Sequence, residues 1–319
     1  MDLATKPAVT AGITKADTTG ASGGGGLRGT AGAAVSMTLI GTLMAVSAVI
    51  GDYPVFTGQA LRYGLAALIL LPLALRAPVL PQGVREWSLL AALAATGLAG
   101  FNYCLVEASR SADPATVGAV VGATPAIMAI AAPLAARRRP AGRILAAGLV
   151  VATGAVLANG PGGDGDLRGA LFSLGALAGE VLFTLLAVPL LPRLGPLRVS
   201  AYSVALAVPL LAAAGLVTGE HPRLPSPAEG AGLLYLGVVI TALAFLVWFD
   251  ALGRLGPDRA ALFAGLVPVS AAGTGLLLGL GAPSPLQLAG CLLVALGLTC
   301  GVELPRRRST LGAARSRVL

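Results

Sequence analysis

The chain has 319 residues, of which 56% are hydrophobic and only 11% are charged. Soluble domains carry about 25% charged residues, and a soluble chain this apolar would have no surface to present to water. The composition therefore excludes a soluble protein and predicts an integral membrane protein. The net charge of +8 then reflects loops and tails around a lipid bilayer, not a nucleic-acid-binding surface.

Apolar segments long enough to cross a bilayer follow one another along the chain. Residues 1–30, with scattered Ser and Thr and the run Gly23–Gly26, predict a disordered tail. Membrane-crossing helices need about 17–25 apolar residues. We count ten, separated by breaks rich in Pro, Gly or charge: about 31–50, 57–75, 88–106, 115–136, 144–159, 169–190, 197–218, 230–252, 260–280 and 286–303. Residues 305–319 form a basic tail.

The segment at 144–159 is short enough to merge with a neighbour, which would reduce the count from ten spans to nine. The distribution of the positive charges decides between these two counts. With ten spans and both ends in the cytoplasm, eighteen of the 22 Lys and Arg residues lie on the inside. Only Arg110, Arg168 and Arg223 lie in outside loops, and Arg62 lies within a span. This bias agrees with the positive-inside rule. We predict a multi-pass inner-membrane protein with cytoplasmic termini.

The sequence also repeats itself, since a set of residues in the first half recurs in the second half in the same order and with the same spacing. The matched residues are Pro114 with Pro257, Gly122 with Gly265, Pro125 with Pro268, Pro140 with Pro283 and Gly154 with Gly297; an acid followed by Ala, Glu107-Ala108, matches Asp250-Ala251. Such self-similarity indicates an internal duplication.

Each copy, residues 31–160 and residues 161–304, holds five spans. Because five is odd, the second copy must cross the membrane upside down. The predicted fold is an all-α membrane protein with ten transmembrane helices in two inverted five-helix repeats. Such repeats are typical of secondary transporters, whose substrate site lies near the midplane between the halves.

Glu180 is the strongest candidate for chemistry. It lies midway along the sixth span, with no basic residue nearby in sequence. Because a charge in the bilayer costs a few kcal/mol, such a residue normally faces a cavity or a partner. Apolar surroundings favour the protonated carboxyl group, which could then exchange a proton. The alternative is a protonated carboxyl group that only ties helices together.

Three further charges lie within or near the ends of spans. Arg62 could snorkel to the lipid headgroups, or line the cavity and bind an anionic group. Glu107 and Asp250 suit an interfacial cap or an ion pair with a loop arginine. Because the two acids are equivalent in the repeat, a role as a gating pair is an alternative interpretation. In one version of it, Arg62 pairs with Glu107.

Other polar, aromatic and helix-breaking residues occur at cavity depth. Tyr and Trp serve as interface anchors as readily as ligands; the candidates here are Tyr63, Asn102, Tyr103, Tyr202, Thr241 and Trp248. Pro125 and Pro268 interrupt backbone hydrogen bonds and should kink their spans, with Gly122 and Gly265 allowing close approach. Freed carbonyls there could coordinate substrate, or the kinks could serve helix packing alone.

The sequence lacks the motifs of several catalytic, metal-binding and ATP-driven mechanisms. His221 is the only histidine and falls in an outer loop, which excludes a histidine relay or triad. The cysteines Cys104, Cys291 and Cys300 lie in apolar runs without metal-ligand spacing. No Walker lysine motif is present, so transport driven by the chain's own ATP hydrolysis is excluded. We expect no metal and no cofactor.

These motifs resemble those of the drug/metabolite transporter superfamily, in particular its ten-span EamA-type members. In each repeat an Ala ends the third span, a short polar loop follows, and a small-residue helix with a central Pro comes next: Ala108 through Pro125, and Ala251 through Pro268. Arg62-Tyr63 fits the family's arginine-aromatic position. The resemblance covers about residues 31–304. It implies movement of small metabolites, often amino acids or toxic compounds, usually outward and often against protons.

We therefore expect a transporter, not an enzyme, that exports a small organic metabolite, amino acid or drug by proton antiport with alternating access. Assigning proton coupling to Glu180 is our inference from the residues, and Arg62 would contact an anionic group or form a gate. The alternative is an uncoupled facilitator or uptake permease of the same fold, in which Glu180 has only a structural role. A membrane enzyme or scramblase is a remote alternative, because no polar cluster gathers at one interface. Substrate, direction and the choice between monomer and homodimer are open.

Overall fold

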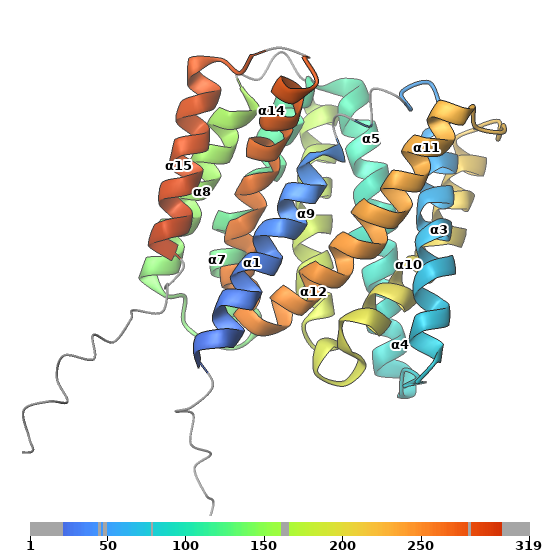
Figure 1. Ribbon diagram of the computed structural model, residues 1–319, viewed down its shortest axis with the longest axis horizontal. Coiled ribbons are helices and arrows are strands. Elements are labelled where there is room, and N and C mark those ends of the chain that lie inside the picture. The colour runs from blue at the N-terminus through green and yellow to red at the C-terminus, as the bar shows by residue number, and fades with distance from the viewer. Residues whose placement is uncertain are drawn as a thin grey trace, which may run out of the picture.

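The computed structural model describes residues 22–43, 46, 50–77, 79–160, 166–279 and 282–301, and the regular elements of that part are helices (Figure 1). The first repeat comprises α1 (Ser22–Gly41), α3 (Val55–Leu75), α4 (Gly83–Ala92), the π-helix η1 (Leu93–Gly100), α5 (Phe101–Ser111), α6 (Pro114–Val121), α7 (Thr124–Ala135) and α8 (Gly142–Asn159). The second comprises α9 (Leu167–Ala187), α10 (Leu191–Val217), α11 (Pro227–Tyr235), the π-helix η2 (Leu236–Leu243), α12 (Ala244–Leu255), α13 (Pro257–Ala260), the 3-10 helix η3 (Ala261–Gly265), α14 (Leu266–Leu277) and α15 (Pro285–Gly301).

Each of the ten predicted spans overlaps one helix or one run of consecutive helices among the described residues. Within the described residues, eight runs are long and apolar enough to cross a membrane. The 17-residue α15 is a shorter apolar helix, and α1 covers the first part of the predicted span at 31–50. The first described residues of α1 and the last of α15 lie at the same end of the bundle (Figure 1), as an even number of crossings requires.

The N-terminal boundary differs from the prediction. The sequence predicts a disordered tail over residues 1–30, whereas α1 begins at Ser22. The extra turns pack against α12: a Cβ on Gly29 would lie 3.0 Å from the Cβ of Arg254. This tertiary contact outweighs the poor intrinsic helix propensity of glycine. Residues 1–21 and the basic tail at 305–319 lie outside the described residues.

The backbones of the two repeats have the same irregular helical segments at equivalent positions. η1 and η2 begin at the equivalent residues Leu93 and Leu236 and end at the equivalent residues Gly100 and Leu243, so the third span of each repeat contains the same π-helical segment. The fourth span is interrupted in both copies as well. In the first copy α6 gives way to α7 after Val121, and in the second the 3-10 helix η3 stands between α13 and α14. These interruptions fall where the glycine and proline pairs of the two copies predict a kink.

The two repeats interlock. α1 packs against α12 and α14 of the second repeat, and α9 packs against α5, η1, α6 and α7 of the first. Equivalent helices pair directly, α3 with α10 and α8 with α15, the latter side by side in Figure 1. Small residues allow this contact, since a Cβ on Gly154 would lie 2.8 Å from the carbonyl oxygen of Gly290.

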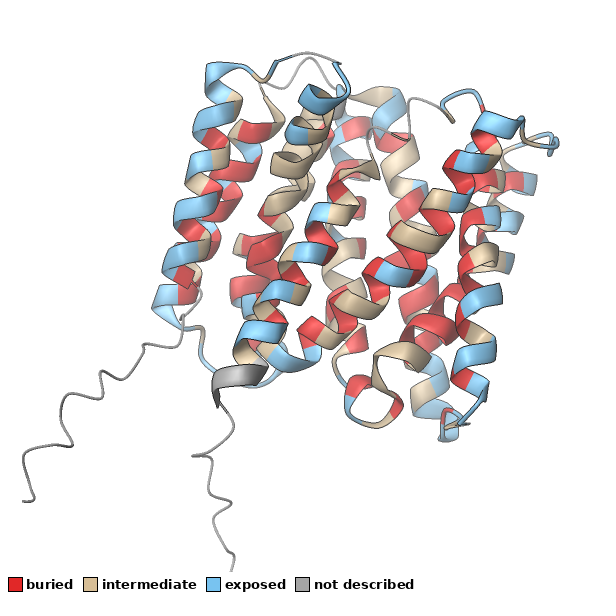
Figure 2. Cartoon of the chain, viewed as in Figure 1, coloured by how far each residue is buried: buried red, intermediate tan, exposed pale blue. Residues whose placement is uncertain are grey.

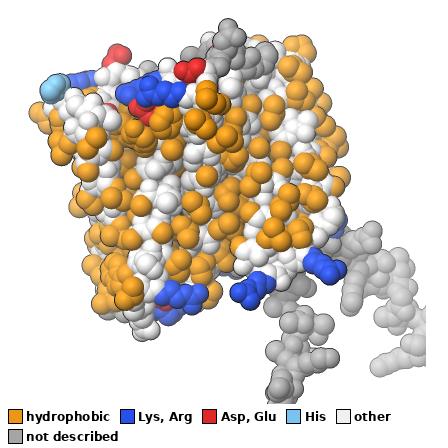
Figure 3. Space-filling model, turned by 180° about the vertical axis from the view of Figure 1, so that it is seen from behind, with side chains coloured by type: hydrophobic (Ala, Val, Ile, Leu, Met, Phe, Trp, Pro, Cys, Tyr) orange, Lys and Arg blue, Asp and Glu red, His pale blue; other side chains and the backbone are white. Residues whose placement is uncertain are grey.

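The surface of the bundle suits a bilayer. Buried residues line the contacts between helices and exposed ones face outward (Figure 2). Leucines such as Leu68, Leu216 and Leu292 are exposed on the outside. Hydrophobic side chains cover the middle of the face seen in Figure 3, and charged side chains gather at its two ends. The protein is therefore a multi-pass membrane protein.

Candidate functional site

Glu180 lies in α9 at the contact between the repeats. The preceding residue, Gly179, packs so tightly that an added Cβ would lie 3.0 Å from the Cβ of Phe101 and from the carbonyl oxygen of Thr96. The following residue, Val181, packs against the cluster around Met128 of α7. Glu180 itself is partly exposed. Within the described ranges it forms no ion pair.

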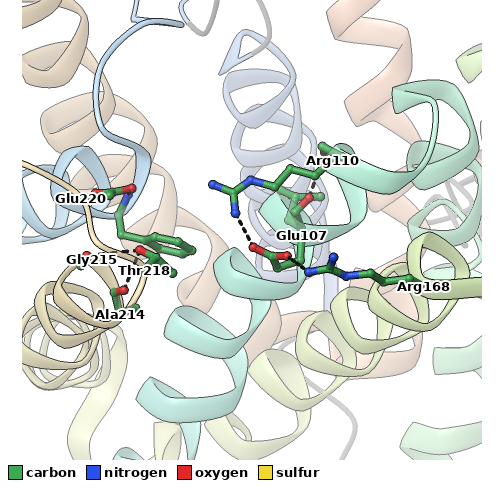
Figure 4. Close-up of polar contacts among 10 residues, drawn as sticks. Glu107, Arg110, Arg168, Ala214, Gly215, Thr218 and Glu220 are labelled. Atoms are coloured by element: carbon green, nitrogen blue, oxygen red, sulfur yellow. Dashed lines mark hydrogen bonds and ion pairs between the residues drawn. The ribbon is translucent and has the colours of Figure 1, made fainter.

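Glu107, by contrast, is held by two arginines. Its carboxylate accepts a hydrogen bond from Arg110 at 2.6 Å and one from Arg168 at 2.7 Å. Figure 4 shows the two arginines approaching it from opposite sides. Arg168 belongs to α9, so this pair joins the end of α5 in the first repeat to the start of α9 in the second. The predicted ion pair is thus present, but both arginines belong to helices, Arg110 to the end of α5 and Arg168 to the start of α9.

Asp250 occupies the equivalent place at the opposite end of the molecule. Its carboxylate accepts hydrogen bonds from Arg254 at 2.7 and 2.9 Å and lies 3.7 Å from Nε of Arg28. Arg28 belongs to α1, so this contact joins the end of α12 in the second repeat to the start of α1 in the first.

The backbone contacts around the two acids are equivalent too. A Cβ on Gly169, next to Arg168, would lie 2.8 Å from the Cβ of Ala112. A Cβ on Gly29, next to Arg28, would lie 3.0 Å from Cγ of Leu255, the residue that matches Ala112 in the duplication. We call these two junctions, Glu107 with Arg168 and Asp250 with Arg28, the α5–α9 clamp and the α12–α1 clamp.

The two clamps are not equally tight. The side chain of Glu107 is only 4% exposed and is bonded by both arginines, whereas that of Asp250 is 33% exposed. The distance to the cross-repeat arginine is 2.7 Å in the first clamp and 3.7 Å in the second. The α5–α9 end of the bundle is therefore held more firmly than the α12–α1 end.

Arg62 points into the bundle and not toward the headgroups. It is 7% exposed, its Nε donates to Thr241 at 2.6 Å, and its Nη1 donates to Gln59 at 3.2 Å. Its guanidinium lies 5.3 Å from the ring centroid of Tyr63. These partners are neutral, and no carboxylate pairs with Arg62 in the part of the chain that the structure describes. The predicted Arg62–Glu107 pair is wrong for this conformation, because Arg62 turns toward η2 while Arg110 and Arg168 bind Glu107.

Comparison with known proteins agrees with this repeated architecture. The EamA-like transporter family matches residues 27–160 and, separately, residues 167–301. The chain belongs to this family. A relative described as "Uncharacterized transporter YetK", from Bacillus subtilis (strain 168), is 24% identical over 251 residues, 75% of this chain and 76% of the relative. A solved crystal structure with 21% sequence identity has the same fold, with a TM-score of 0.73 over 90% of this chain and 99% of the other.

The aromatic residues of this EamA-like transporter gather between its repeats. Phe183, one turn beyond Glu180, lies 5.2 Å from Phe245 and 5.1 Å from Phe249 between ring centroids. Phe245 in turn meets the ring of Tyr63. The hydroxyl group of Tyr63 accepts a hydrogen bond from Asn102 at 3.2 Å. These rings form an apolar wall that joins α3, α9 and α12.

The other candidates lie in different environments. Trp248 is buried, and its indole N–H has no acceptor among the residues described. Tyr103 is 38% exposed and stacks on Phe56. Tyr202 lies near the turn before α4, with its hydroxyl group 3.5 Å from the carbonyl oxygen of Val79. The structure therefore brings neither Tyr103 nor Tyr202 to Glu180.

Two hollows lie on the flanks of the bundle. One, of about 880 Å³, runs between α3 and α10 and is lined by apolar side chains such as Leu65, Leu68 and Val208. The other, of about 610 Å³, lies between α5 and α9 beside Cys104 and Phe172. Neither is lined by Glu180 or Arg62, so neither defines the translocation site.

Sequence reasoning missed two contributors, Arg28 and Arg168, which complete the clamps. A signal for the arginines was present, because the triplets Leu27-Arg28-Gly29 and Leu167-Arg168-Gly169 begin the two repeats.

Proposed function

We propose that this transporter exports a small organic metabolite, amino acid or drug across the inner membrane by alternating access, in exchange for protons that Glu180 carries. The observation that carries the proposal is the difference in ion pairing between Glu180 and the two other acids, Glu107 and Asp250. Glu107 and Asp250 are ion-paired at opposite helix ends, whereas Glu180 lies within a span without an ion pair in the described residues. An unpaired carboxyl group at membrane depth is suited to bind and release a proton.

The two clamps support the alternating-access part of the proposal. In an inverted-repeat transporter, alternating access is largely a rigid-body rocking or gating of one repeat against the other around a fixed site. Equivalent ion pairs at opposite ends of the bundle, each joining the two repeats, meet the need for one gate on each side. With the termini in the cytoplasm, the tight α5–α9 clamp is the outer gate and the looser α12–α1 clamp is the inner gate.

Arg62 supplies the contact for the substrate's negative group. A buried arginine whose partners are neutral lacks a counter-charge, and a carboxylate or other anion of the substrate would provide it. The apolar wall of Tyr63, Phe183 and Phe245 suits the hydrocarbon part of a small solute. The working partners are then the solute, protons and the bilayer.

The second candidate is an uncoupled facilitator or uptake permease of the same fold. The close packing of Gly179 against Phe101 and Thr96 favours it to the extent that this part of α9 serves only to join the two repeats. In that case the carboxyl group of Glu180 would stay protonated throughout the transport cycle, and no proton would cross with the substrate.

Transport by purified protein in liposomes that hold a pH-sensitive dye distinguishes the two. Amino acids, small amines and cationic drugs are tested with an imposed proton gradient, comparing wild type with Glu180→Gln and with Glu220→Gln, an acid outside the spans, as control. Substrate-dependent proton flux that persists in Glu220→Gln and is lost in Glu180→Gln supports antiport. Substrate flux without proton movement, unchanged in Glu180→Gln, overturns antiport and favours the facilitator.

A further inference from the structure

Thr241 lies in the π-helical segment η2 and is fully buried. Its hydroxyl group donates to the carbonyl oxygen of Leu236, five residues earlier, at 2.8 Å. The same oxygen accepts a hydrogen bond of 2.6 Å from Nε of Arg62. A threonine hydroxyl group has one hydrogen to donate, and that hydrogen is directed at Leu236. The oxygen is therefore left to accept from Arg62, and the two bonds together fix the hydroxyl group in this orientation.

η2 approaches the backbone of α3 closely beside this contact. A Cβ on Gly237 would lie 3.1 Å from the carbonyl oxygen of Arg62 and 2.8 Å from the Cβ of Leu65, so the approach depends on a residue without a side chain. α3 belongs to the first repeat and η2 to the second. Arg62 is thus held by its own helix through Gln59 and by the opposite repeat through Thr241.

The guanidinium of Arg62 keeps donors that the described residues do not use. A guanidinium has five N–H groups in one plane. The one on Nε is bonded to Thr241 and one on Nη1 is bonded to Gln59. The other three have no acceptor in the part of the chain that the structure describes, although Arg62 is only 7% exposed. Because the group is planar, its two contacts also fix the directions of these three donors.

No acid on the neighbouring elements balances the charge of Arg62 within the described ranges. α3 packs against α10, η2 and α11. η2 has no charged residue, α10 has only arginines, and the one acid of α11, Glu229, is ion-paired with Arg223. Glu220, after α10, accepts hydrogen bonds from the backbone at the start of α3. A ligand group with a single negative charge would balance Arg62, and a carboxylate also matches its planar donors.

We propose that Thr241 is the positioning residue that orients Arg62 to bind a substrate carboxylate through two N–H groups. This inference rests on the proposed function and names the carboxylate as the group that is recognised. Thr241 does not itself bind the carboxylate, because its hydroxyl group is engaged between Arg62 and Leu236. A guanidinium that is already oriented loses less freedom on binding. Removing the hydroxyl group therefore weakens carboxylate binding while the positive charge stays in place.

The first repeat shows that a π-helical segment does not need an arginine contact to form. Leu98 in η1 is the residue equivalent to Thr241. α10, which packs against η1, has no charged residue over 199–217. η1 does contain a hydroxyl group, since Thr96 donates to the carbonyl oxygen of Ala92 at 2.7 Å, but no arginine donates to Thr96 among the residues described. Thr96 therefore provides a matched control for Thr241.

Nitrogen NMR of the full chain in detergent, with isotope-labelled arginine, tests the orientation without a known substrate. The Nε–H signal of Arg62 is identified by its loss in Arg62→Lys. In Thr241→Val this signal should change frequency and exchange with deuterated water about tenfold faster, because the N–H group loses its acceptor. Thr241→Ser, which keeps the hydroxyl group, should restore both properties. Thr96→Val, which removes a hydroxyl group from the other π-helical segment, should leave them unchanged.

Carboxylate binding is measured as the rise in melting temperature of the purified protein. Each amino acid is tested beside its primary amide, which lacks the negative charge. The acids should stabilise the wild type more than the amides do. Thr241→Val should raise the dissociation constant of the tightest-binding acid by about tenfold, and Thr241→Ser should not.

An Arg62 signal that does not respond to Thr241→Val would overturn the positioning role. Acids and amides that stabilise equally, or not at all, would overturn the carboxylate as the recognised group. Both results leave proton exchange by Glu180 standing, because neither measurement involves it. The expected responses at Arg62, combined with liposome transport that moves no protons, would support the inference and overturn proton antiport.

Discussion

Replacing Glu107 by Gln should open the α5–α9 clamp. The glutamate is 4% exposed and accepts two short bonds from arginines that are 56% and 62% exposed. Hydrogen bonds to charged groups contribute about 1.5–3 kcal/mol each, but pairs with exposed arginines are worth about 0–1 kcal/mol. Because one partner is buried and the other is not, we expect a loss of about 1–2 kcal/mol for the clamp, which corresponds to a roughly five- to thirtyfold higher open population.

Cysteine labelling measures this population. Ala108 follows Glu107, Ala251 follows Asp250, and both are fully buried. In a chain whose Cys104, Cys291 and Cys300 are replaced by Ser, Ala108→Cys should react with a soluble maleimide only when its clamp opens. Glu107→Gln should accelerate that reaction by about five- to thirtyfold.

The opposite clamp provides the matched control. Asp250→Asn in an Ala251→Cys chain should accelerate labelling by only about twofold, because Asp250 is 33% exposed and its cross-repeat contact is 3.7 Å long. Equal acceleration at the two clamps, or no acceleration at Ala108→Cys, would refute the argument that burial makes the α5–α9 clamp the firmer gate.

Two further predictions concern stability. Gly97→Ala should destabilise the bundle by about 1–3 kcal/mol, because its Cβ would lie 2.7 Å from the Cα of Phe183. Gly64→Ala, with nothing within 4 Å of its Cβ, should be neutral or stabilising by up to about 1 kcal/mol; melting in detergent compares the two, and equal effects would contradict the packing argument. Burial raises the pKa of Tyr53, which lies outside the spans, above its ordinary value of 10.0. The folded state then holds its proton more tightly than the unfolded state, so stability is present below pH 10 and falls as the pH rises above it. Tyr53→Phe should flatten the fall in melting temperature above pH 10, and an unchanged slope would show that Tyr53 does not contribute to it.

The spans and the repeat were predictable because both are properties of the chain itself. Whether a segment enters the bilayer depends on its own hydrophobicity and on nearby positive charges, so the ten segments could be read without knowing how they pack. A duplication leaves its register in the chain, and Pro125 and Pro268 marked in advance the spans that are interrupted. The start of α1 was misplaced because glycine-rich sequence favours disorder locally, and only contact with α12 makes it helical.

The partners of the charged and polar side chains required the tertiary structure. Arg168 lies 61 residues from Glu107, and Thr241 lies 179 residues from Arg62. In spans composed so uniformly of Ala, Leu and Gly, no amphipathic stripe tells which face of a helix turns inward. Small residues decide that face by letting certain helices approach closely, and this depends on the shape of both helices at once. The sequence by itself therefore determined the membrane class, the ten spans and the inverted repeat, and only packing decided that Arg62 turns to Thr241 and that Arg168 and Arg28 close the two clamps.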